Sequence, residues 1–253
     1  MTTISIVIPT LNEEKYLPIQ LDSFSKQTIR PYELIYVDGG STDATRVIIQ
    51  EFSKGATNTI LITRPRASEL ECRNVGAEMS KGDVLLFLSA DVLLPPNTLE
   101  KIARDFESNQ NLIGVTGLPL PFEATQMLRL EYSVWNGLKT LSAHLPRPLK
   151  TFITSSSFMA VKKDRFLLLE GFDTNNVNAD GAIGAKLISM GDALFDTTLP
   201  YFLSGRRYNK VGMLGFNRQF LYNAVEDFFP PISRLRGLDG FRRIIRGSHG
   251  SVT

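Results

Sequence analysis

The chain has 253 residues, of which 43% are hydrophobic and 21% charged, and its formal net charge at pH 7 is +2. This composition is typical of a soluble globular domain and argues against a membrane-spanning chain, because no segment approaches the roughly 20 consecutive apolar residues of a transmembrane helix. The single cysteine, Cys72, excludes an internal disulfide and a thiolate metal site, so we expect a buried and idle thiol. The first residues show no signal-peptide pattern, which predicts a cytoplasmic protein.

Apolar runs and helical spacing alternate through the first half of the chain. Strands are predicted at 4–8, 34–37, 59–63 and 84–88, and helices at 16–27, 43–52, 70–79 and 96–106. Repeated strand–helix units of this kind predict a parallel sheet with helices on both faces. We therefore expect an α/β domain.

The pattern weakens after Gly117. The Pro-rich stretch 118–122 is predicted to be a turn, followed by a helix at 124–141, a strand at 157–161 and helices at 163–169, 180–190, 213–228 and 232–245. Positive charge gathers at the end of the chain, where residues 204–253 carry nine Lys and Arg against three acidic residues. Such a basic segment indicates contact with an anionic partner, or else a solvated basic helix.

Polar residues follow three of the predicted strands where each strand ends. Thr10 and Glu13 follow the first strand, Asp38 opens a glycine turn after the second, and Asp91 comes after the fourth. In open α/β sheets, ligands bind at the carboxyl ends of the strands, and carboxylates there suit Mg²⁺. The alternatives are local: Asp91 as a turn residue, and Glu13 as a helix cap like Asp43.

Four segments in this order resemble the motifs of family 2 glycosyltransferases of the GT-A type. They are Pro9-Thr10-Leu11-Asn12-Glu13, Val37-Asp38-Gly39-Gly40-Ser41-Thr42-Asp43, Arg73-Asn74-Val75-Gly76-Ala77 and Phe87-Leu88-Ser89-Ala90-Asp91. Weaker matches follow at 170–173, 179–180 and 204–208. The resemblance implies a Rossmann-like, mostly parallel sheet flanked by helices. It implies a catalytic domain over 1–212, with a nucleotide-binding half (1–117) and an acceptor-binding half (118–212), and a C-terminal basic amphipathic helical segment over 213–253.

The resemblance also implies residue roles. Asp38 would accept a hydrogen bond from the base, Arg73 would approach the donor diphosphate, and Asp91 would hold Mn²⁺ or Mg²⁺. Asp180 would be the general base for the acceptor hydroxyl. The whole donor site would comprise Pro9, Thr10, Glu13, Asp38, Gly40, Arg73, Ser89, Ala90, Asp91, Arg206 and Arg207. Two alternatives stay open: Arg73 can simply pair with Glu69 or Glu71, and Arg206 and Arg207 can be surface charges.

Two departures from the family pattern concern carboxylates. The metal motif usually reads Asp-x-Asp, whereas this chain has Ser89-Ala90-Asp91, and the acidic pair before the base helix reads Ala179-Asp180. We expect weaker metal binding, with Asp173 and Asp192 as nearby substitutes should Asp180 not be the base. The departures also leave room for a degenerate relative without catalysis.

The resemblance thus implies an inverting, hexosyltransferase-type enzyme that moves a sugar from a nucleotide donor, expected to be a UDP-sugar, to a glycan or lipid-linked acceptor, through a hydroxyl or a lipid phosphate. The alternatives are a non-catalytic nucleotide-sugar-binding or scaffold protein and, less favoured because no glycine-rich phosphate loop follows the first strand, a sugar nucleotidyltransferase. No nucleic-acid partner is expected, and a homo-oligomer stays open. Residues 213–253 would place the protein peripherally at the inner face of an anionic membrane, or would pack onto the catalytic domain or a second subunit.

Overall fold

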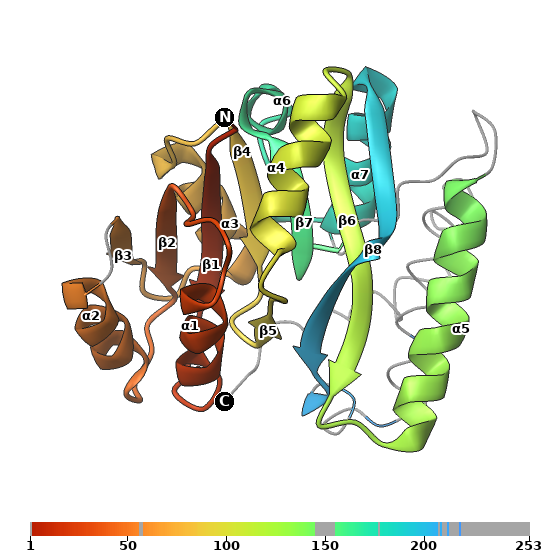
Figure 1. Cartoon of the computed structure of the whole chain (residues 1–253). Helices are drawn as coiled ribbons and strands as arrows, with labels where there is room; N and C mark the ends of the chain where they lie inside the picture. Colours follow the sequence, from red (N-terminus) through yellow and green to blue (C-terminus); the bar gives the residue numbers. More distant parts are fainter. Residues whose placement is uncertain are drawn as a thin grey trace.

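The computed structural model describes residues 2–55, 58–144, 155–176 and 178–206, together with Tyr208, Gly212 and Arg218 (Figure 1). Its strands are β1 (Ile4–Thr10), β2 (Glu33–Asp38), β3 (Thr59–Thr63), β4 (Val84–Leu88), β5 (Val92–Leu93), β6 (Leu112–Phe122), β7 (Phe158–Lys162) and β8 (Asp192–Ser204). Its helices are α1 (Leu17–Ser25), α2 (Thr45–Gly55), α3 (Glu69–Met79), α4 (Thr98–Ser108), α5 (Gln126–Ala143), α6 (Lys163–Leu168) and α7 (Ala179–Met190). The predicted helices at 213–228 and 232–245 lie outside the described residues, as does Arg207.

All eight strands form one sheet in the order β3-β2-β1-β4-β7-β6-β8-β5. Strands β1 to β4 are parallel to one another where they pair, β7 is antiparallel to both β4 and β6, and β8 is parallel to β6. Because the direction reverses twice across β7, strands β1, β2, β4, β6 and β8 all end at the same edge. Three segments that are far apart in sequence therefore reach one edge: those after Thr10, Leu88 and Ser204.

Both faces of the sheet are covered over β1, β2 and β4, where every residue is buried and successive side chains point to opposite faces. In β4, Leu86 and Leu88 pack in a cluster with residues of α1 and α4, while Leu85 and Phe87 pack in a second cluster with residues of α3, α6 and α7. Figure 1 shows α4 in front of this sheet and α5 beside the long β6–β8 pair. The helices thus fix the sheet from both sides and leave its carboxyl-end edge for polar residues.

The predicted elements of the first half are confirmed, each boundary within a few residues. The turn predicted at 118–122 is wrong, because these residues extend β6. Pro119 and Pro121 suggested a turn, but β6 pairs with β7 only through Gly114 and Val115, so beyond Gly117 its ladder is on the β8 side. Proline is tolerated where one side of a strand needs no amide donor. Strands β5 and β8 were not predicted from the sequence.

Cys72 is 2% exposed, and burial raises the pKa of its thiol to about 11, which confirms a buried thiol. Within the described part of the chain, no helix combines the length and the apolarity that crossing a membrane demands.

Candidate functional site

The glycine turn after β2 is organised by Asp38, which is fully buried. Its Oδ1 accepts hydrogen bonds from the amides of Gly40 (3.1 Å) and Ser41 (3.0 Å), and its Oδ2 accepts one from the Ser41 hydroxyl and a longer one from Thr10 (3.4 Å). Gly40 has φ +111°, a backbone conformation that residues with a side chain rarely adopt. Asp38 therefore fixes the turn. To recognise a base, one of its oxygens would have to accept a further hydrogen bond beside those from the turn.

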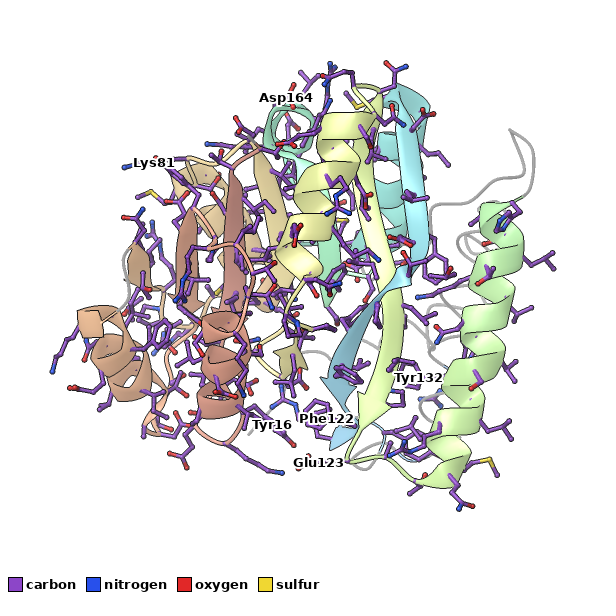
Figure 2. The ribbon with its side chains drawn as sticks, in the orientation of Figure 1. Tyr16, Lys81, Phe122, Glu123, Tyr132 and Asp164 are labelled. Carbon is purple, nitrogen blue, oxygen red and sulfur yellow. The ribbon has the colours of Figure 1, made fainter. Side chains whose placement is uncertain are left out.

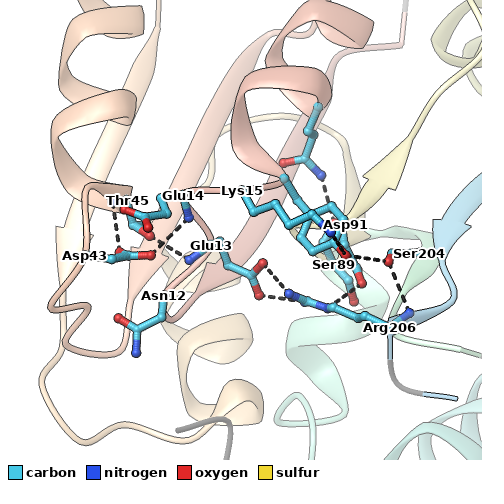
Figure 3. A network of polar contacts seen from close by, with 12 residues as sticks. Asn12, Glu13, Glu14, Lys15, Asp43, Thr45, Ser89, Asp91, Ser204 and Arg206 are labelled. Atoms are coloured by element: carbon cyan, nitrogen blue, oxygen red, sulfur yellow. Dashed lines mark hydrogen bonds and ion pairs between the residues drawn. The ribbon is translucent and has the colours of Figure 1, made fainter. Parts of the chain in front are cut away.

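One guanidinium joins the ends of three strands (Figure 3). Arg206, directly after β8, donates two hydrogen bonds to Glu13, from Nη1 to Oε2 (2.6 Å) and from Nη2 to Oε1 (2.7 Å). Its Nε lies 2.8 Å from Oδ2 of Asp91, which follows β4. We call Glu13, Asp91 and Arg206 the arginine clamp. The clamp brings together three predicted donor-site residues and shows that Arg206 is no isolated surface charge.

Burial dominates the electrostatics of both clamp carboxyls. It raises the pKa of Glu13, and the hydrogen bonds and charge of Arg206 oppose the rise. It likewise raises the pKa of Asp91, again against the charge of Arg206. Because burial penalises the ionised form, the charge of Arg206 favours the ionised state of each carboxylate against this penalty. At this edge of the sheet, one cation is thus held between two desolvated carboxylates.

Tyr16 packs against the guanidinium of the arginine clamp, a contact that the sequence did not predict. The Arg206 guanidinium lies over the Tyr16 ring, 4.9 Å from its centroid, which is a cation–π distance. The Tyr16 hydroxyl donates to Glu123 (3.0 Å) and accepts from Ser204 (3.0 Å). Figure 2 shows Tyr16 beside Phe122 and Glu123 at the end of β6. These contacts tie the segment that carries Arg206 to α1 and β6.

Arg73 forms a second charged centre on α3 and is fully buried. Its Nη2 donates to Glu69 Oε1 (2.6 Å) and to the Ser89 hydroxyl (3.3 Å), and its Nη1 donates to the Leu88 carbonyl (3.3 Å). The pairing with Glu69 was the local alternative, and it is present. A guanidinium with no exposed surface reaches a donor diphosphate only if the groups that cover it move.

Asp180 lies in the first turn of α7, whose amino terminus points to the same sheet edge. Its Oδ2 accepts from the Ser156 amide (3.0 Å) and hydroxyl (3.1 Å), just before β7. Burial raises the pKa of the Asp180 carboxyl, while the Ser156 bonds and the charge of Arg73 oppose the rise. A raised carboxyl pKa is the tuning expected of a general base that must also release its proton.

Two predicted site residues, Pro9 and Ala90, are buried in the core instead of offering side chains to the clamp. Pro9 is buried in β1, where it pairs with Val37. Ala90 is 2% exposed and belongs to a core cluster, so only its backbone lies near Asp91. Besides Tyr16, two residues outside the predicted site contribute, Glu69 and Ser156. An acid in the first helical turn looks like a cap, and a serine before a strand carries no signal, so the sequence could not single them out.

A divalent cation fits the clamp carboxylates. Among the residues that the structure describes, no three His, Cys, Asp or Glu side chains gather into a metal cage. Mg²⁺ commonly takes one or two carboxylates together with substrate phosphates, however, and needs no such cage. Glu13 and Asp91 already hold one cation between them, the Arg206 guanidinium. The hard oxygen donors of this pair therefore suit a cation that is shared with a phosphate-bearing ligand.

Solved structures place the fold in one class. A mannosyltransferase from Pyrobaculum calidifontis, solved in complex with GDP-Man and Mn²⁺, is similar over 98% of this chain and 69% of its own, with a TM-score of 0.71 and 19% sequence identity. TarS of S. aureus in complex with UDP-GlcNAc is similar over 96% of this chain and 70% of its own, with a TM-score of 0.64 and 14% identity. The eight-stranded sheet and these neighbours confirm the predicted GT-A type α/β fold.

Sequence comparison identifies the family. Residues 5–166 match the model of glycosyl transferase family 2, so the chain belongs to that family. An O-antigen chain rhamnosyltransferase of Salmonella typhimurium is 27% identical over 207 residues, 74% of this chain and 62% of its own length. A PGL/p-HBAD biosynthesis glycosyltransferase of Mycobacterium tuberculosis is 41% identical over 101 residues, 39% of this chain and 40% of its own. The chain thus spans less than two thirds of the length of these relatives.

Proposed function

We propose that this chain transfers a hexose-type sugar, with inversion, from a nucleoside-diphosphate donor to an acceptor hydroxyl or a lipid phosphate. Family membership supports glycosyl transfer as the reaction class. The donor class is supported by the fold neighbours, whose structures contain GDP-Man, UDP or UDP-GlcNAc. A UDP-sugar is the donor that we expect, with a GDP-sugar as the competing candidate.

The arginine clamp is the observation that carries this proposal. It places two desolvated carboxylates and a guanidinium at the carboxyl-end edge, beside the turn built by Asp38. Ligands of open α/β sheets bind at this edge. A diphosphate needs positive charge there, which Arg206 and a divalent cation on Asp91 would provide. Mn²⁺ or Mg²⁺ supplies Lewis-acid stabilisation of the departing diphosphate when it is bound.

We assign donor binding and proton transfer to residues of the chain itself. Asp38 and Thr10 bind the base side of the donor, and Arg206 is positioned to contact the diphosphate. The acceptor oxygen attacks the anomeric carbon while the bond from that carbon to the phosphate oxygen breaks, and the nucleoside diphosphate leaves with the bonding electrons. Asp180 takes the proton of an acceptor hydroxyl. With a lipid phosphate, which is already ionised, Asp180 orients the acceptor.

Turnover with Asp91→Asn tests the metal assignment. UDP- and GDP-sugars are incubated with the protein, Mn²⁺ and a set of hydroxyl and lipid-phosphate acceptors, and the released nucleoside diphosphate and the product are measured by mass spectrometry. Asp91→Asn should reduce transfer by about a hundredfold or more, as for other groups that stabilise charge in the transition state. Asp22→Asn is the matched control, since Asp22 is exposed and pairs with Lys26 on α1. Near-normal turnover of Asp91→Asn would refute the metal role.

A second candidate function is nucleotide-sugar binding without turnover. It is favoured by the ion pair of Asp91 with Arg206, which occupies the predicted metal ligand, and by serine and alanine at positions 89 and 179. Calorimetry separates the two candidates. Donor binding with neither transfer nor donor hydrolysis would favour the binding protein, whereas product formation that depends on Asp91 supports the enzyme.

A further inference from the structure

Glu69 lies at the entrance of the second charged centre, on the first turn of α3. The capping box of this helix is formed by Ser68 and Glu71, so Glu69 is not needed as a cap. Its Oε1 lies 2.6 Å from Arg73 Nη2, and the same nitrogen lies 3.3 Å from the Ser89 hydroxyl. The Glu69 side chain is 51% exposed, whereas that of Arg73 is fully buried. Glu69 therefore connects a buried guanidinium to the solvent-exposed surface.

A buried guanidinium requires a carboxylate, because an uncompensated charge inside a protein is strongly unfavourable. The Ser89 hydroxyl and the Leu88 carbonyl are neutral partners and cannot balance the charge of Arg73. Both belong to the segment that ends β4 and leads to Asp91. Arg73 thus ties α3 to the segment that carries Asp91, and Glu69 provides the contacting carboxylate at 2.6 Å.

The charge of Glu69 acts on three other acidic groups of the candidate site. Its negative charge is one of the influences that raise the pKa of Glu13, of Asp91 and of Asp180, although burial is the largest influence on each. The charge of Arg73 acts in the opposite direction on Asp180. Removing the charge of Glu69 would therefore lower the pKa of carboxyls on the proposed donor side, Glu13 and Asp91, and on the proposed acceptor side, Asp180.

We propose that Glu69 is a positioning residue of the donor site: it supplies the carboxylate that position 89 lacks and thereby holds Arg73 against the segment that carries Asp91. This inference rests on the proposed function, because it gives Arg73 and Glu69 a task in donor binding. Since one Arg73 nitrogen contacts both Glu69 and Ser89, a carboxylate at either position can balance the same guanidinium. Carboxylates at both positions would crowd negative charge around Asp91.

This geometry predicts that the effect of Ser89→Asp reverses sign with the residue at position 69. In the unmodified chain, Ser89→Asp should lower kcat/KM for the donor, and Glu69→Gln should lower it about tenfold, mainly through donor KM, as expected for a coupled charge network. In the Glu69→Gln background, Ser89→Asp should restore most of the loss. A purely structural role for Glu69 would leave donor KM unchanged in protein that is fully folded at the assay temperature.

Glu71→Gln is the matched control. Glu71 is the other acid in the first turn, and its carboxylate accepts from the Ser68 amide rather than from Arg73. Glu71→Gln should weaken the helix cap, and Ser89→Asp should not rescue it. Rescue in both backgrounds, or in neither, would overturn the proposal.

Urea unfolding of the ligand-free proteins gives an independent measurement. The same four-protein cycle should show that Ser89→Asp destabilises the chain when Glu69 is present and stabilises it when Gln replaces Glu69. Additive effects would overturn the shared-guanidinium geometry. If the unmodified chain transfers no sugar from any donor, the proposed function fails, while the unfolding cycle still decides whether positions 69 and 89 share Arg73.

Discussion

Replacing Arg206 with alanine removes the cation that joins Glu13 and Asp91. The variant loses three charged contacts of 2.6, 2.7 and 2.8 Å and leaves two carboxylates whose side chains are 9% and 13% exposed. Removing one partner of a fully buried ion pair costs about 3–5 kcal/mol. Because the Arg206 side chain is 33% exposed, solvent screening lowers this to about 2 kcal/mol. For a chain of this size, we expect the melting temperature to fall by about 4–8 °C.

Thermal unfolding with and without Mn²⁺ checks both the magnitude and its cause. Without divalent metal, Arg206→Ala should melt below the unmodified protein, and Arg206→Lys should lie between them because it keeps the charge but loses the bidentate geometry. Mn²⁺ should then raise the melting temperature of Arg206→Ala more than that of the unmodified protein, since the guanidinium no longer competes for the carboxylates. Equal metal effects on both proteins, or a loss of less than about 1 °C without metal, would refute this account.

Three further variants test the acceptor side and the packing. Asp180→Asn should reduce transfer to a hydroxyl acceptor by about a hundredfold or more, with little change for a lipid phosphate; equal losses would exclude the base role. Because burial raises the Asp180 carboxyl pKa, the folded protein loses stability as pH rises from the ordinary carboxyl range through this raised pKa. Asp180→Asn should lack this decline, which urea unfolding between pH 4 and 7.5, as a rough span, would show. Gly76→Ala should destabilise the chain by about 1–3 kcal/mol, because its Cβ would lie 2.4 Å from Val7 Cγ1. Gly137→Ala, which meets nothing within 4 Å on α5, should be neutral or stabilising by up to about 1 kcal/mol in the same urea titration.

Local patterns predicted the first half of the fold because β1, β2 and β4 are buried along their whole length and each helix has its own periodicity. The pattern failed at β6, where Pro119 and Pro121 look like turn residues unless the neighbouring strands are known. It failed again at β8, whose exposed and buried residues do not alternate regularly. Strand pairing between distant segments decides these cases, and a single sequence does not display it.

The site was predictable to the extent that its residues stand directly after strands. Glu13 and Asp91 follow β1 and β4, so their meeting at one edge could be inferred from a parallel sheet. Their link to Arg206 could not, because it depends on the return of β8 to that edge, 193 residues after Glu13. Glu69 was visible only as a local partner of Arg73, and its proximity to the other carboxyls became evident from the fold.

The balance of acidic and basic groups around the arginine clamp suggests why a donor would bind together with a metal ion. In the described residues, the acidic groups Glu13, Glu69, Asp91 and Asp180 influence one another's ionisation or share a cation, and the guanidiniums of Arg73 and Arg206 oppose them. Arg73 is fully buried and its two terminal nitrogens are bound to Glu69, Ser89 and the Leu88 carbonyl, so of these two guanidiniums it is Arg206 that can exchange partners. A diphosphate that binds beside these groups would meet net negative charge, and turning Arg206 toward it would uncover Glu13 and Asp91. Under the proposed function, Glu13 and Asp91 would hold a divalent cation that compensates their charge, and Arg206 would contact phosphate oxygens of the donor.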